Sequence, residues 1–173
     1  MGSQVGPIPP SDPTRRKGPY LRALEWAAKR RPVTWFLIHV GNRVDPVLMR
    51  ATGGRLRVAP GSPTVLLTHV GARTGQRRAT PLAYFTDGEN VVLMASKGGA
   101  PRHPAWYHNV CANPDVQLWA GGRGGRYRAR KADGAEYERL WGLACTMYDG
   151  YAKYQELAGS RRIPLIVCEP VED

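Results

Sequence analysis

The sequence predicts an α+β domain that is mainly β: a small closed or half-closed barrel of about six antiparallel strands, with N-terminal and peripheral helices. Three observations favour this fold. Short, apolar, β-rich runs recur from Thr64 onward, glycine-bearing turns separate them, and helical periodicity occurs before and between them. A chain of 173 residues, 42% of them hydrophobic, suits a single domain with a substantial core.

The first third of the chain is expected to be an arm followed by helices. Residues 1–18 are rich in proline, so we expect a disordered or extended arm. Residues 19–54 form the helical segment: a basic amphipathic helix over Pro19–Arg31, a second from Pro32 through Val40, and a third that Asp45-Pro46 opens and Gly53-Gly54 ends. The barrel is expected over residues 55–173.

The barrel strands follow in order. The first three are Val65–Val70, Pro81–Phe85 and Val91–Met94, of which the last two form a hairpin at Asp87-Gly88. A further hairpin pairs Val116–Trp119 with Tyr127–Lys131 around the glycines of residues 121–125, and Ile163–Cys168 makes the last strand.

Two helices are expected between these strands. Pro104 opens one that carries Trp106 and Tyr107 and stops near Asn113-Pro114. Asp133 caps another, whose apolar face consists of Tyr137, Leu140, Trp141 and Ala144.

Charge limits the classes of partner. A net charge of +11 and a pI near 10.1 imply an anionic partner: nucleic acid, an acidic membrane surface or a polyanionic small molecule. The cysteines are widely separated and odd in number, which argues against a disulfide framework or zinc site: Cys111, Cys145 and Cys168. No metal is expected, because the histidines also lack ligand spacing: His39, His69, His103 and His108.

The expected location is the cytoplasm. Residues 1–18 lack the apolar region of a signal peptide, and the apolar runs are too short and interrupted to span a bilayer. Contact between the basic helix and the anionic inner face of the cell membrane is left open.

Two cation-rich glycine turns followed by an aromatic pair are the strongest functional signal. Gly71–Arg78 reads Gly-Ala-Arg-Thr-Gly-Gln-Arg-Arg, Ala95–Ala100 reads Ala-Ser-Lys-Gly-Gly-Ala, and Trp106-Tyr107 follows. Glycine lets the backbone approach a ligand and present amide N–H groups to an anion, and the cations neutralise phosphate or carboxylate. The spacing matches neither a P-loop nor a Rossmann fingerprint. The stretch predicts a site for a large anionic cofactor; the alternative is solvated turn charges.

These motifs resemble the deazaflavin-dependent nitroreductase family, whose relatives reduce nitro compounds and quinones with reduced coenzyme F420. The resemblance runs from about Pro32 to Pro170. It rests on the two glycine turns and on further matches at Arg78, Pro81, Trp106-Tyr107, Asn109, Thr146-Met147-Tyr148, Tyr151, Tyr154, Arg162-Ile163-Pro164 and Val167-Cys168-Glu169-Pro170. Two positions depart from the pattern: Ala72 replaces a cation, and Thr80 replaces an asparagine.

The resemblance implies a split β-barrel, which dimerises in many relatives, with coenzyme F420 as cofactor and FMN less favoured. It implies a cofactor-binding set in and near the two turns: Ala72, Arg73, Thr74, Gly75, Arg78, Thr80, Pro81, Ala95, Ser96, Lys97, Gly98, Gly99, Trp106 and Asn109. Because adjacent residues of a strand point to opposite faces, Arg78 rather than Arg77 is expected to line the site. Trp106 is equally well interpreted as a core anchor.

Tyr148, Tyr151 and Tyr154 are three residues apart, so a helix would gather them on one side. They could form the buried face of that helix, but the interruption at Asp149-Gly150 favours a lid over a pocket. In the nitroreductase relatives, tyrosines at these places line the substrate site. Together with Ser96, which either hydrogen-bonds a ring carbonyl or substrate or is a plain turn residue, they are the expected catalytic residues.

The resulting hypothesis is an F420H2-dependent oxidoreductase that transfers a hydride to a quinone, a nitro compound or another conjugated acceptor. It would act as a monomer or homodimer, without a specific nucleic-acid partner. Two alternatives stay open: a nucleic-acid or anionic-membrane-surface binding module driven by the charge of +11, and an FMN-dependent enzyme on the same fold.

Overall fold

The computed structural model describes residues 4–14, 18, 44, 47 and 63–171. The helices expected within residues 19–54 lie outside the described residues, apart from single positions. They therefore stay predictions, as do the domain boundaries at residues 18 and 54.

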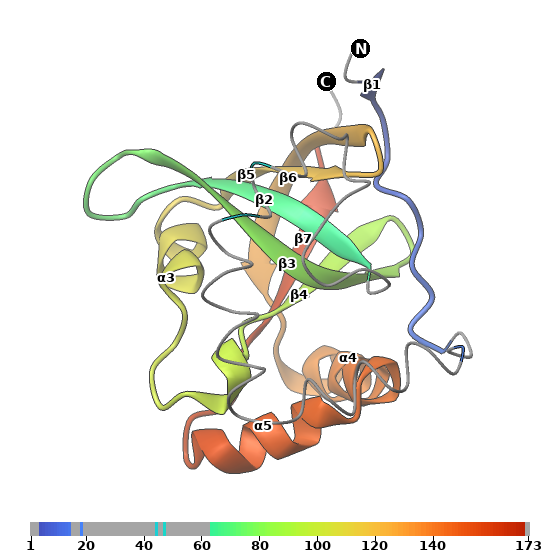
Figure 1. Ribbon diagram of the computed structural model, residues 1–173, viewed down its shortest axis with the longest axis vertical. Helices are drawn as coiled ribbons and strands as arrows, with labels where there is room; N and C mark the ends of the chain where they lie inside the picture. The colour runs from blue at the N-terminus through green and yellow to red at the C-terminus, as the bar shows by residue number, and fades with distance from the viewer. Residues whose placement is uncertain (1–3, 15–17, 19–43, 45–46, 48–62, 172–173) are drawn as a thin grey trace.

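Six antiparallel strands close into a barrel (Figure 1). Around the barrel the order is β6 (Arg123–Lys131), β5 (Asp115–Ala120), β2 (Thr64–Val70), β3 (Arg77–Asp87), β4 (Asn90–Met94) and β7 (Leu165–Pro170). β7 pairs back onto β6, so the sheet has no free edge between its first and last barrel strands. The predicted mainly β barrel is confirmed.

The strands differ from the prediction chiefly at their ends. β3 begins at Arg77 instead of Pro81, since its pairing with β2 continues to the mouth of the turn. The β5–β6 turn is confined to Gly121-Gly122, and the next glycines belong to β6. A Cβ atom on Gly124 would lie 2.1 Å from Cε3 of Trp119, so glycine is needed in that strand to admit the indole ring.

Apolar side chains cover both faces of the wall formed by β4 and β7. Along β4, Val91 and Leu93 belong to the cluster inside the barrel, whereas Val92 and Met94 pack outward against α4 (Gly134–Met147). β7 alternates in the same way. Burial on both faces explains why these strands appear in the sequence as continuous apolar runs.

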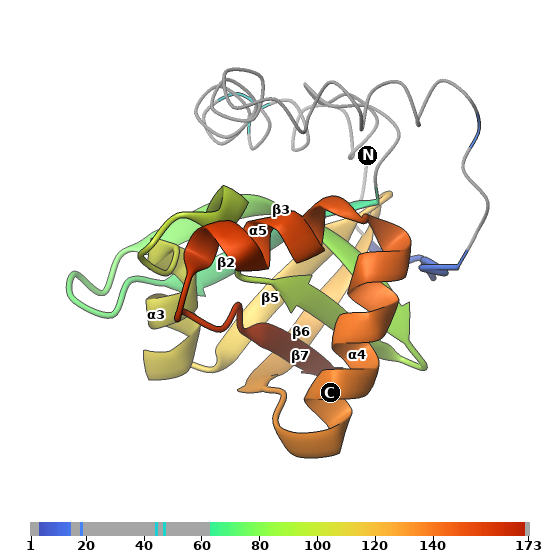
Figure 2. The same ribbon diagram turned by 90° about the horizontal axis from the view of Figure 1, so that it is seen from below.

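Three α-helices of the described ranges pack against the barrel (Figure 2). α3 (Ala105–Ala112) packs on β2 and β6, α4 packs on β7, and α5 (Gly150–Ala158) packs on the short 3-10 turn η1 (Lys97–Gly99). The helices predicted from Pro104 and Asp133 are confirmed. Asp133 occupies the N-cap position, but its side chain makes no capping hydrogen bond.

The N-terminal arm lies along the barrel where it is described. β1 (Gln4–Val5) pairs in parallel with the start of β6, beyond the stretch that β7 occupies. Ile8 is 5% exposed, and its N–H donates to the Tyr127 hydroxyl at 3.3 Å. The Tyr84 hydroxyl donates to the Pro9 carbonyl at 2.8 Å. The arm that was expected to be disordered or extended is thus extended and packed over these residues.

Candidate functional site

The turn between β2 and β3, residues 71–76, is the first of the two glycine turns. The Gly71 N–H donates to the Gln76 carbonyl, and the Gly75 N–H donates to the Gly71 carbonyl, both at 2.9 Å. Gly75 has φ +65°, a conformation that L side chains rarely adopt. A Cβ atom on Gly71 would lie 2.8 Å from Oγ1 of Thr74 and 3.5 Å from Nε of Arg78. Glycine therefore allows a hydroxyl and a guanidinium to close over the turn.

A side-chain network ties this turn to α3, β2 and β3. The Ala72 N–H donates to Oδ1 of Asn109 at 2.9 Å. The Asn109 amide nitrogen lies 3.2 Å from Nδ1 of His69, and Nε2 of His69 lies 3.2 Å from Oγ1 of Thr80. An amide nitrogen can only donate, so Nδ1 of His69 accepts and Nε2 carries the proton that is donated to Thr80. The structure thus brings together three predicted residues: Ala72, Thr80 and Asn109.

His69, which links them, was expected to be merely structural or exposed. Its side chain is buried, and that burial lowers its pKa, with a second contribution from the positive charge of Arg78. Both effects favour the neutral ring that the network requires. Strand alternation offered a signal: His69 lies two residues from the buried Leu67, on the same face of β2, where a polar ring needs hydrogen-bond partners.

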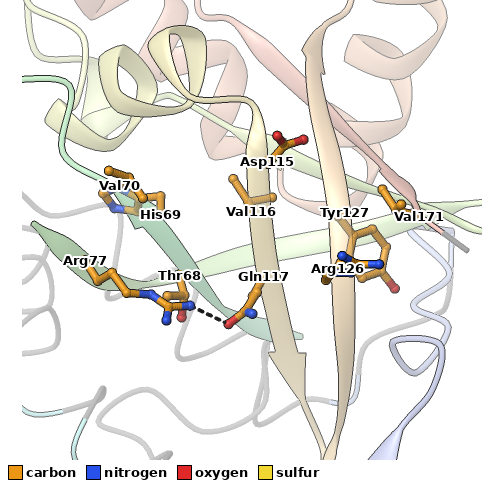
Figure 3. Close-up of a pocket in the computed structure, with 10 residues that line it drawn as sticks. All are labelled: Thr68, His69, Val70, Arg77, Asp115, Val116, Gln117, Arg126, Tyr127 and Val171. Carbon is orange, nitrogen blue, oxygen red and sulfur yellow. Dashed lines mark hydrogen bonds between the residues drawn. The ribbon is translucent and has the colours of Figure 1, made fainter. Parts of the chain in front are cut away.

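Arg77 and Arg78 lie on opposite faces of β3, as strand geometry predicts. Arg78 stands opposite His69 in the strand register. Arg77 donates to Oε1 of Gln117 at 3.1 Å and borders an outer cavity of about 330 Å³ (Figure 3). None of the predicted cofactor-binding residues lines this cavity.

Several cations at the two turns have no partner among the described residues. Within the described parts of the chain, no ion pair or hydrogen bond involves the side chains of Arg73, Arg78 or Lys97. Elsewhere arginines are paired: Arg130 with Glu136 and Glu169, and Arg139 with Asp87. Unpaired, exposed cations gathered at a turn attract an anion.

The second turn, η1 with Ser96, has an unusual backbone. Lys97, Gly98 and Gly99 have φ angles of 49°, 63° and 77°, and Lys97 is the one described non-glycine residue with a positive φ. Such strain in a non-glycine residue is typical of ligand-binding turns. The Ser96 hydroxyl makes no capping hydrogen bond.

This turn is built against α5. A Cβ atom on Gly99 would lie 2.7 Å from the Tyr154 carbonyl oxygen and 2.7 Å from Cβ of Leu157, so only glycine fits. Arg161, for which no pattern in the sequence predicted a role, donates to the carbonyls of Ser96 and Ala100, both at 2.9 Å. No spacing motif could have signalled this contact, because Ser96 and Arg161 are 65 residues apart.

The three tyrosines form one cluster. Their ring centroids lie 5.3 Å (Tyr148–Tyr151), 5.9 Å (Tyr148–Tyr154) and 6.1 Å (Tyr151–Tyr154) apart, and the hydroxyls of Tyr148 and Tyr154 are 3.5 Å apart. Tyr151 is 6% exposed and belongs to the core under α4, whereas the other two are half-buried. A Cβ atom on Gly150 would lie 2.3 Å from the Tyr148 ring, so the Asp149-Gly150 break makes room for that ring.

Other predicted site residues are more dispersed. Trp106 is 6% exposed and lies in the barrel core, in agreement with its interpretation as a core anchor. Pro81 stands opposite Leu66, on the face of β3 away from Thr80. Ala95 is fully buried beside η1, and its N–H donates to the Pro164 carbonyl at 2.9 Å.

Fold and site together define a class. The chain is a closed antiparallel barrel with two glycine turns that carry exposed cations, and the second turn packs against the helix of the tyrosine cluster. Such cations suit an anionic cofactor. The family model described as F420H(2)-dependent quinone reductase matches residues 42–170. The chain belongs to this family, and it is an oxidoreductase whose cofactor is coenzyme F420. The resemblance seen in the sequence is thereby confirmed.

Individual relatives agree. An F420H(2)-dependent quinone reductase of Mycobacterium tuberculosis is 40% identical over 141 residues, which cover 77% of this chain and 94% of the relative. A solved structure described as an F420-H2 dependent reductase (FDR-A) is 41% identical, with a TM-score of 0.58, over 62% of this chain and 94% of that one. Another, described as a domain-swapped dimer, is 36% identical, with a TM-score of 0.60, over 73% and 94% of the two chains.

The described residues contain neither a metal-binding cluster nor a membrane-spanning helix. No group of three or more His, Cys, Asp or Glu side chains there is arranged to hold a metal ion. Nor does any helix in the described ranges have the length and apolar character needed to cross a membrane.

Proposed function

We propose that the β2–β3 turn and η1 hold coenzyme F420 and that the tyrosine cluster lines the side from which the acceptor approaches. One observation carries this: Arg73, Arg78 and Lys97 are unpaired within the described chain and lie at turns whose backbone takes positive φ angles. F420 joins a deazaflavin ring to a phosphate and a carboxylate tail. Its charges match these cations, and its ring matches an aromatic wall, so the residues present fit the cofactor.

The chain's own residues bind and orient. Bound F420H2 supplies the hydride, and no covalent nucleophile of the protein is needed. Asn109 holds the Ala72 N–H and so fixes the shape of the first turn. The Ser96 hydroxyl makes no capping hydrogen bond, and its proposed role is to hydrogen-bond a ring carbonyl or the acceptor. Burial raises the pKa of Tyr148 well above its ordinary value, so this phenol keeps its proton at neutral pH and donates to an acceptor oxygen.

The acceptor is a quinone, and we extend the proposal to nitro compounds. Both carry oxygen atoms that gain electron density on reduction, and hydroxyl donors such as Tyr148 and Tyr154 stabilise that charge. Assays with a soluble quinone and a nitroaromatic compound under the same conditions test this. Turnover of the quinone alone would limit the proposal to quinones.

Titration with F420 and with FMN tests the cofactor assignment. We expect a Kd for F420 of about 1 μM or below, and weaker binding of FMN, because its shorter tail reaches fewer cations. Equal or tighter binding of FMN would favour the alternative of an FMN enzyme. Duplex DNA serves as the control for charge alone: its binding should be weak and should disappear near physiological salt.

Assembly and location complete the proposal. We propose a homodimer, on the ground that one related structure is described as a domain-swapped dimer, and light scattering of the purified protein tests this.

We also propose a weak cytoplasmic contact with anionic membranes, supported by the net charge of +11. Sedimentation with anionic and with neutral vesicles tests the membrane contact. Equal partitioning of the protein onto both kinds of vesicle would contradict an electrostatic contact.

A further inference from the structure

Arg161 lies just beyond α5 and has its own backbone fixed. Its N–H donates to the Ala158 carbonyl at 3.2 Å. The Gln155 side chain bridges the next residues: its Nε2 donates to the Arg161 carbonyl at 2.9 Å, and its Oε1 accepts from the Ile163 N–H at 2.8 Å. The guanidinium therefore extends from a rigid base.

The guanidinium reaches across to the segment that contains η1. Nε donates to the Ala100 carbonyl at 2.9 Å, and Nη2 donates to the Ser96 carbonyl at 2.9 Å. Nη1 donates to the Ala95 carbonyl at 3.3 Å and to Nδ1 of His103 at 3.1 Å. All three guanidinium nitrogens thus donate to acceptors that lie before and after the turn. The planar guanidinium of arginine can reach all of these acceptors, whereas the single ammonium group of lysine cannot.

The segment held in this way cannot maintain its shape by local bonds alone. Its own hydrogen bonds are two of 3-10 type, from the Gly99 N–H to the Ser96 carbonyl at 3.1 Å and from the Ala100 N–H to the Lys97 carbonyl at 3.2 Å. Three successive positive φ angles oppose them, one of them in a lysine. The same segment leads into α3, which brings Asn109 to the first turn.

We propose that Arg161 is a positioning residue for cofactor binding: it fixes the Ser96–Gly99 turn in its strained shape before F420 arrives. This inference rests on the proposed function of that turn. A turn that is already ordered loses less conformational freedom on binding, and the ligand then binds more tightly. Because Arg161 is anchored to α5, it also couples the cofactor turn to the helix that carries Tyr151 and Tyr154.

Amide hydrogen exchange in the cofactor-free protein tests the structural half. In Arg161→Gln we expect the Gly99 and Ala100 amides to exchange at least about tenfold faster than in the wild type. Arg162→Gln is the matched control, because it removes the same charge one residue away, where Arg162 is exposed and contacts Glu138 and the Tyr137 ring. Unchanged exchange in Arg161→Gln would overturn the inference.

F420 titration tests the functional half. Arg161→Gln and Arg161→Lys should weaken F420 about tenfold or more, whereas Arg162→Gln should stay within about twofold of the wild type. Arg161→Lys keeps the charge, so a loss of F420 affinity in this variant is due to the missing guanidinium geometry. This variant also provides the test if Arg161→Gln does not fold. Free guanidinium ion should restore affinity to Arg161→Ala more than sodium ion does at equal ionic strength.

The outcomes separate this inference from the proposal beneath it. Equal F420 affinity of the wild type, Arg161→Gln and Arg161→Lys would overturn the positioning role alone. Wild-type protein that binds no F420 would overturn the proposed function and this inference together.

Discussion

Arg77 and Arg78 are neighbours in the sequence and differ in the face of β3 they occupy, which makes them a matched pair for experiment. Arg78 and Lys97 have no partner in the described chain, so each is free to contact an anionic cofactor. A charge-assisted hydrogen bond contributes about 1.5–3 kcal/mol, so Arg78→Ala or Lys97→Ala should weaken F420 about ten- to a hundredfold. Arg77→Ala should leave affinity nearly unchanged. Equal losses in the Arg77 and Arg78 variants would show that only net charge matters.

The tyrosine cluster makes a second prediction at this scale. Tyr148→Phe removes the hydroxyl and keeps the ring, so we expect kcat to fall about tenfold to a thousandfold while the Kd for F420 stays constant. Tyr151→Phe should lose less, because the Tyr151 ring is buried in the core. Full turnover by Tyr148→Phe would return the cluster to its interpretation as a buried stripe.

His69 makes the stability of the protein depend on pH. An unfolded histidine takes up a proton near pH 6.5, whereas in the folded protein burial and then Arg78 lower the pKa of His69. Between these two pKa values the unfolded state binds more protons than the folded state. The contribution of His69 to the free energy of unfolding is therefore fully present above about pH 6.5 and is lost as the pH falls below it. The free energy of unfolding, measured from pH 8 to pH 5, should decline in this window less steeply for His69→Asn. Parallel pH profiles of the two proteins would contradict this.

The site residues found from the sequence share a local signature, whereas those that were missed depend on distant partners. Glycine and charge patterns marked the Ala72 and Lys97 turns, because both depend on neighbouring residues. His69 contacts Asn109, 40 residues away, and Arg161 contacts Ser96, 65 residues away, and no spacing rule connects either pair. Strand alternation indicates that His69 is buried, but these partners emerge only from the fold.

At the scale of elements, η1 and α5 constrain one another through a glycine. Gly99→Ala introduces a Cβ atom 2.7 Å from the Tyr154 carbonyl at φ +77°, whereas Gly75→Ala has φ +65° and no atom within 4 Å. Gly75→Ala should cost about 1–2 kcal/mol from backbone strain alone. Gly99→Ala should cost more and should also weaken F420. Thermal unfolding and F420 titration of both variants check this. Equal destabilisation of the two variants would show that α5 shifts to accommodate the added Cβ atom at little cost.

The elements were predicted well where a pattern is intrinsic and poorly where a boundary depends on a partner strand. β4 was recognised because apolar residues cover both of its faces. The apolar run placed the start of β3 at Pro81, although strand alternation was already used for Arg77 and Arg78; the pairing with β2 carries the strand back to Arg77. Gly124 was assigned to a turn, although the Trp119 ring requires it within the strand.

At the scale of the whole molecule, the arm contributes to the core. Proline content predicted a disordered or extended arm, and in the described part Ile8 packs beside Tyr127, which lies 119 residues further along the chain. Ile8→Ala should lower the free energy of unfolding by about 2 kcal/mol or more, as for other buried large-to-small changes. Val171→Ala, at a side chain that is 42% exposed, should cost clearly less. Denaturant titration of both variants measures these changes. An unchanged free energy of unfolding in Ile8→Ala would show that the arm does not stabilise the barrel.

β7 pairs with β4 on one side and with β6 on the other, so one late segment supplies both seams that close the barrel. During synthesis, the ribosome must therefore finish residues 165–170 before either seam can form, and β4 and β6 wait with unpaired edges. A nascent chain in this state is a substrate for chaperones and for pairing with another copy of itself. The speed at which the β7 segment is translated after β4 and β6 thus bears on the yield of folded protein.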